Sequence, residues 1–164
     1  MSAQPSLKEE KRPSAFSPSL IGWIMSVLAI VLPFIVQISG TGVETDFTVA
    51  ATAWMYQNSS YNTGFRFFTA QEWLASMLFT LPRLLFAYQM YRYYQEKTTR
   101  MMTVLAGVFS ELPVALVMTA LLFWNAVSPT PSFLPTVVPI PILITVGFLM
   151  IWKRPTFVPT GPWD

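Results

Sequence analysis

Arg83 and Glu111 are the two residues whose type and position could support chemistry within otherwise apolar segments. Arg83 lies in residues 79–86 and Glu111 in residues 109–114. A charge at the centre of a bilayer costs at least ~2.5–3.5 kcal/mol on insertion scales, so such residues usually pair or mark a functional site. An arginine can hold a carboxylate through two parallel hydrogen bonds. The sequence therefore predicts an Arg83–Glu111 pair inside the membrane.

Three uses of this pair are compatible with the sequence. It can be a structural ion pair that sets the register of two helices. It can belong to a transport path, with Glu111 as a titratable carboxylate and Arg83 as its partner or as a site for an anionic substrate. It can also contact a helix of another subunit.

Catalysis has little support in the residue types present. The chain has no cysteine and no histidine, which removes thiolate nucleophiles, His-ligated haem and nearly all zinc and iron sites. Glu44 and Asp46 stand apart from other acidic residues, and Ser110 beside Glu111 is no fragment of a catalytic triad. We expect no catalytic residues, no metal site and no cofactor, and we interpret the protein as a non-enzyme.

The composition is that of a membrane protein. Of 164 residues, 53% are hydrophobic and only 11% are charged, an apolar excess compared with soluble domains. The net charge of +2 is too small, and the basic residues too scattered, to favour a nucleic acid. The expected partners are the lipid bilayer and other membrane subunits or further copies of the chain.

The apolar segments predict an all-α integral membrane protein with four transmembrane helices in an antiparallel bundle. A helix needs ~20 apolar residues to cross a ~30 Å hydrocarbon layer. The expected organisation is a disordered tail at 1–19, spans at 20–39, 73–91, 101–127 and 136–152 within a membrane domain at 20–154, an extracytoplasmic loop at 40–72 and a short tail at 155–164.

Local signals refine this outline. Thr69 and Glu72 are spaced as a capping box that opens the second span. The loop at 40–72 is rich in aromatic residues, which favours folding onto the membrane surface through a short helix at 47–57, with a mobile loop as the alternative. Asn58 begins an N-glycosylation sequon. A cleaved signal peptide is the rival interpretation of the first span.

The distribution of Lys and Arg predicts the orientation. Eight of the ten basic residues fall on one side when four spans alternate across the membrane: Lys8, Lys11, Arg12, Arg92, Lys97, Arg100, Lys153 and Arg154. The positive-inside rule then places both termini in the cytoplasm, and the plasma membrane is the expected location of this multi-pass protein.

Prolines and small residues recur within the predicted spans. Each span carries proline near mid-depth, at Pro33, Pro82, Pro113 and the pair Pro139 and Pro141. These residues are either packing kinks or hinges around a site, since proline leaves one carbonyl without its helix donor. Small and polar residues predict a helix-packing seam between spans two and three, with Thr103, Gly107, Ala115 and Thr119 on one side and Ser76 and Thr80 on the other.

Together these features favour a small polytopic membrane protein that acts as a non-catalytic scaffold or accessory subunit of a larger membrane assembly. The alternative is an oligomeric transporter or channel component that uses the Arg83–Glu111 pair.

Overall fold

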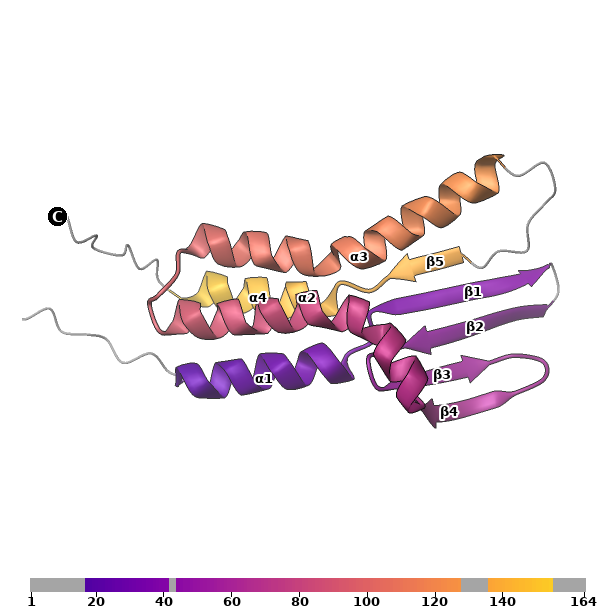
Figure 1. Ribbon diagram of the computed structural model, residues 1–164, viewed down its shortest axis with the longest axis horizontal. Coiled ribbons are helices and arrows are strands. Elements are labelled where there is room, and N and C mark those ends of the chain that lie inside the picture. Colours follow the sequence, from indigo (N-terminus) through magenta and orange to yellow (C-terminus); the bar gives the residue numbers. More distant parts are fainter. Residues whose placement is uncertain (1–16, 42–43, 128–135, 155–164) are drawn as a thin grey trace, which may run out of the picture.

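The computed structural model describes residues 17–41, 44–127 and 136–154, and it divides into a helical half and a sheet half (Figure 1). Nine elements follow one another: α1 (Pro18–Val31), β1 (Ile35–Thr41), β2 (Glu44–Ala50), β3 (Trp54–Asn58), β4 (Thr63–Phe67), α2 (Ala70–Tyr94), α3 (Arg100–Val127), β5 (Thr136–Pro139) and α4 (Ile142–Lys153). In Figure 1, α1, α4, most of α2 and the first part of α3 lie at one end, the strands lie at the other, and the second part of α3 continues alongside β5.

The five strands form one antiparallel sheet in the order β4-β3-β2-β1-β5. β1 pairs with a strand on each side: Ile35 lies opposite Ala50 of β2 and also opposite Pro139 of β5. The strand that precedes α4 is thereby joined to the strand that follows α1.

The expected all-α four-helix bundle is wrong, because the structure contains this sheet. Two of the predicted spans are each a helix plus a strand: residues 20–39 divide into α1 and β1, and residues 136–152 divide into β5 and most of α4. Proline lies at both divisions, where it interrupts helical hydrogen bonding. The short helix expected at 47–57 is also wrong, since these residues lie largely in β2 and β3, whose β-branched and aromatic side chains suit a pleated surface.

The multi-pass membrane location is likewise contradicted. Among the described residues, the segment Arg100–Trp124 of α3 is the one helical stretch long and apolar enough to cross a membrane. With 14 and 12 residues, α1 and α4 extend about 21 Å and 18 Å at ~1.5 Å per residue, less than a ~30 Å hydrocarbon layer. α2 is long enough, but it carries Glu72, Arg83 and Arg92 among many polar residues.

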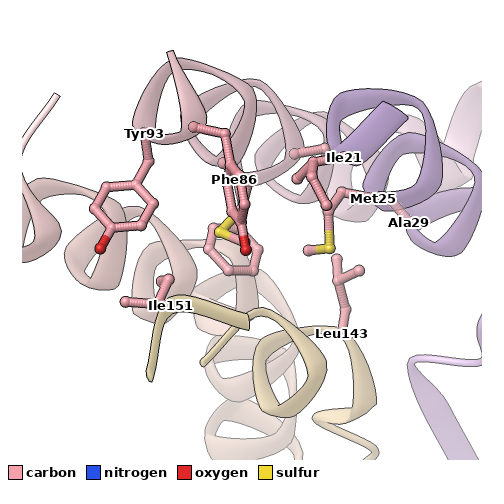
Figure 2. Packing of buried hydrophobic residues seen from close by; sticks show 10 residues of the cluster. Ile21, Met25, Ala29, Phe86, Tyr93, Leu143 and Ile151 are labelled. Carbon is pink, nitrogen blue, oxygen red and sulfur yellow. The ribbon is translucent and has the colours of Figure 1, made fainter. Parts of the chain in front are cut away.

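The core of the helical half is built around Phe86 of α2 (Figure 2). Its ring is fully buried and faces glycines on two other helices. A Cβ added at Gly147 of α4 would lie 2.4 Å from the Phe86 ring, and one at Gly107 of α3 would lie 3.0 Å from it. Glycine is therefore required at Gly147 by close approach. Ile21 and Met25 of α1 contribute to the same cluster.

The capping box at the start of α2 is confirmed. The Thr69 side chain accepts from the backbone N–H of Glu72, and the Glu72 carboxylate accepts from the backbone N–H of Thr69. The last three residues of the tail expected at 1–19 belong to the helix: Ser17 caps α1, and residues 18–19 are its first two residues. Residues 1–16 and the tail expected at 155–164 lie outside the described residues.

Candidate functional site

Arg83 and Glu111 lie together in the interior, on α2 and α3. Arg83 Nε is 3.9 Å from Glu111 Oε1, and the exposed fractions of the two side chains are 0% and 15%. This separation is an ion pair but exceeds hydrogen-bond length. Both carboxylate oxygens of Glu111 and two guanidinium nitrogens of Arg83, Nε and Nη2, are buried without a hydrogen-bond partner in the described part of the chain.

The third guanidinium nitrogen of Arg83 contacts the end of α1. Nη1 donates to the carbonyls of Ala29 at 3.4 Å and Leu32 at 3.2 Å. Pro33 explains why Ala29 needs an outside donor, because the N–H that would continue the helix to that carbonyl does not exist in proline. A cation at a helix C-terminus is also favoured by the helix dipole. Arg83 is thus a cap for α1 as well as a partner for Glu111.

Thr52, which lies between β2 and β3, and Trp54, the first residue of β3, complete this cap. The Thr52 hydroxyl donates to the Ala29 carbonyl at 3.3 Å, and the Trp54 indole N–H donates to the Val31 carbonyl at 3.0 Å. The polar groups that α1 leaves unpaired at its end are therefore met by residues from the sheet half and from α2.

One aromatic ring, that of Phe34, lies against the guanidinium group. Its carbon atom lies 5.5 Å from the centroid of the Phe34 ring, and Phe34 stacks on Phe79 with 5.4 Å between centroids. A cation over an aromatic face is attracted by the ring quadrupole, more strongly where water is excluded. The Phe34 contact gives Arg83 a second reason to remain charged in the interior.

The predicted packing seam is divided by the structure. Ser76 and Thr80 are buried and face Thr52: the Ser76 hydroxyl lies 3.0 Å from the Thr52 carbonyl, and the Thr80 and Thr52 hydroxyls are 3.0 Å apart. On α3, Thr103 is buried and Gly107 faces Phe86 and Phe148.

Ala115 and Thr119 are exposed on the following turns of α3. A stripe that repeats every four residues drifts by about 40° per step around a helix with 3.6 residues per turn. α3 also changes direction along its length (Figure 1) and contains Pro113. The residues at the two ends of the stripe therefore lie on different faces.

The five predicted prolines do not form one layer of helix kinks. Pro82 lies inside α2 and Pro113 inside α3. Pro33 follows α1, Pro139 ends β5 and Pro141 precedes α4. Three of the five thus lie where the chain changes between helix and strand.

Two further Arg–Glu pairs connect elements outside this site. Arg66 of β4 makes two hydrogen bonds to Glu72 of α2, at 2.6 and 2.9 Å. The hydrogen bonds from Arg66 and, to a smaller extent, those from Thr69 lower the pKa of Glu72 to about 2. Arg154 donates to the Tyr93 carbonyl at the end of α2 and to Glu96 at 3.3 Å.

The chemistry of the site is that of a buried polar junction. No group of three or more metal-ligating side chains occurs in the described ranges. Sequence reasoning missed Thr52, Trp54 and Phe34, although Pro33 was the signal: it identifies Ala29 as a carbonyl in need of a donor. Compared with known proteins, the chain matches no protein-family model, no curated protein and no solved structure.

Proposed function

We propose that the chain is a non-catalytic, membrane-associated protein that serves as a scaffold or accessory subunit, with its helical half in contact with lipid. The observation that supports this most directly is the apolar exterior of the helices. Large hydrophobic side chains are exposed on all four: Trp23 and Val27 on α1, Leu74 and Leu78 on α2, Leu116 and Phe123 on α3, and Leu149 and Trp152 on α4, among others.

Such a surface is unfavourable in water. Soluble monomers rarely expose contiguous apolar patches of more than a few hundred Å². In the most apolar 18-residue stretch of α3, only 17% is buried inside the protein. This helix therefore lacks the cover that a core helix receives. Lipid acyl chains or apolar helices of a partner protein can cover the exposed apolar side chains of α3. Either kind of cover is expected for a subunit that works through contacts.

Fractionation of cell membranes tests the association. We expect the full chain to stay in the membrane pellet after a high-pH carbonate wash and to need detergent for release. A monodisperse protein that remains in the supernatant without detergent would contradict the proposal.

Matched substitutions locate the lipid-contacting surface. Leu116→Arg places a charge on the apolar exterior of α3 and is expected to lower membrane accumulation, since insertion of arginine costs ~2.5–3.5 kcal/mol at a helix centre. Tyr61→Arg is the control, because Tyr61 is 97% exposed between β3 and β4. Equal accumulation of both variants would argue against a lipid-contacting α3.

The subunit role has its own test. Purification in mild detergent is expected to yield an oligomer or a complex with another membrane protein. A lone monomer with no co-purifying protein would argue for a different role.

Transport is the second candidate, and one observation favours it: the buried carboxylate oxygens of Glu111 have no hydrogen-bond partner among the described residues. Two hollows of the described structure, one between α3 and α4 and one between α1 and α2, are lined by other residues, however. Ion or solute flux in liposomes that disappears in Glu111→Gln would support this candidate over the scaffold.

A further inference from the structure

We propose that the groove between α3 and α4 binds an anionic phospholipid, with its phosphate at Arg100 and an acyl chain along the apolar lining. This inference rests on the proposed membrane association and adds a specific lipid site to it. The groove has a volume of about 390 Å³. Its lining combines Arg100 and Trp152 with Val104, Phe148, Leu149 and Ile151.

Arg100, the charged residue of the groove lining, is not used by the described part of the fold. Each of Arg66, Arg83 and Arg154 has a glutamate partner within 4 Å. Over the described ranges, Arg100 has neither an ion pair nor a side-chain hydrogen bond. Arg100 is also the first residue of α3, where the helix dipole disfavours a cation. Within the described ranges, its charge is therefore available to an anion.

Neighbouring charges strengthen the attraction. The basic end of the molecule, defined as Arg92, Lys97, Arg100, Lys153 and Arg154, brings together the end of α2, the start of α3 and the end of α4 (Figure 1). Glu96 is the single acidic residue within 92–100 and 153–154, and it pairs with Arg154. A basic cluster next to an apolar helical surface attracts anionic headgroups.

The apolar part of the lining selects a lipid rather than a free phosphate. Trp152 is 75% exposed beside Arg100, and tryptophan favours the level of the headgroups, where its ring is in lipid and its N–H is hydrated. About one turn earlier in α4, the Phe148 and Leu149 side chains also line the groove. A ligand with an anionic head and an acyl chain matches both parts.

Fluorescence quenching in vesicles tests the site. The full chain is reconstituted in phosphatidylcholine vesicles that contain brominated phosphatidylglycerol or, separately, brominated phosphatidylcholine. The Trp152 signal is obtained by subtracting the spectrum of Trp152→Phe. We expect phosphatidylglycerol to quench Trp152 at severalfold lower mole fraction than phosphatidylcholine does.

Substitutions at the basic end identify the residue responsible. Arg100→Gln is expected to reduce the preference for phosphatidylglycerol about fivefold, the factor equivalent to ~1 kcal/mol per basic residue near an anionic surface. Lys97→Gln removes the same charge at the same end but outside the groove lining, and it is expected to change the preference much less. Arg100→Lys keeps the charge and is expected to retain most of it.

The outcomes separate the two proposals. A chain that floats with vesicles but shows equal quenching by both lipids, or an unchanged preference in Arg100→Gln, overturns the lipid site and leaves membrane association intact. Equal losses in Arg100→Gln and Lys97→Gln also overturn it, because the attraction would then be general. A chain that does not float with either vesicle overturns the proposed function together with the site.

Discussion

The helical half and the sheet half each attach an Arg–Glu pair to α2, and the two pairs are built in opposite ways. Arg66 and Glu72 are partly exposed at the sheet and share two short hydrogen bonds. Arg83 and Glu111 lie in the interior, 3.9 Å apart, and no hydrogen bond joins them. The better geometry is at the surface, where water screens it. The poorer geometry is inside, where removal of one partner is costly.

Glycines show the same contrast between the two regions. Gly147 in the helical half faces the Phe86 ring, whereas a Cβ at Gly64 of β4 would meet nothing within 4 Å. The helical half thus depends on close approach of its helices, and the outer edge of the sheet does not. Substitutions at matched positions can test both contrasts.

The largest effect is expected for Arg83→Ala. It leaves the Glu111 carboxylate unpaired and removes the Arg83 donor from the carbonyls of Ala29 and Leu32. Breaking a buried pair costs about 3–5 kcal/mol. Chemical unfolding in detergent micelles, followed by circular dichroism, measures this loss, with Arg66→Ala as the exposed control.

The partner substitution divides the loss between its causes. If Arg83 acts mainly on Glu111, then Glu111→Ala added to Arg83→Ala restores much of the stability. If it acts mainly as a cap for α1, the double variant remains as unstable as Arg83→Ala. Equal free energies of unfolding for Arg83→Ala and Arg66→Ala would remove the contrast altogether.

An intermediate effect is expected for Gly147→Ala. The added methyl group would lie 2.4 Å from the fully buried Phe86 ring, and overpacking of this kind costs about 1–3 kcal/mol. The same unfolding experiment measures it, with Gly64→Ala as the control. Wild-type stability of Gly147→Ala would show that the helices around Phe86 separate easily.

The smallest effect is expected for Glu72→Gln, and it depends on pH. Because the pKa of Glu72 is lowered to about 2 in the folded state, its ionisation stabilises the fold above the ordinary carboxyl pKa of ~4.3, and this contribution is lost as the pH falls toward 2. Thermal melts between pH 6 and pH 2 are expected to show a smaller decline for Glu72→Gln than for the parent. Parallel declines would indicate that the Arg66 contact does not affect stability.

Some features followed from short-range rules. The capping box was predictable because Thr69 and Glu72 are three residues apart and meet in any helix that begins there. The proximity of Arg83 and Glu111 followed from similar distances along the chain to a short connection between two helices. Both inferences needed only local geometry and the cost of burying a charge.

The sheet was missed because its strands resemble other structures locally. Residues 35–39 continue the apolar run that begins in α1, so the predicted span at 20–39 covers most of β1. β5 has only four residues and pairs with β1, which lies about a hundred positions earlier in the chain. No local pattern predicts such a distant pairing.

Sequence alone established the apolar character of the chain, the lack of cysteine and histidine, and the presence of two charges that need partners, because these depend only on composition and on the free energy of burial. Tertiary structure decided that α1, which ends at Val31 just before Pro33, meets a polar junction with Arg83, Thr52 and Trp54 as its donors. The reason is physical: a proline shows which carbonyl lacks a donor, but only the folded chain brings in the side chains that replace it.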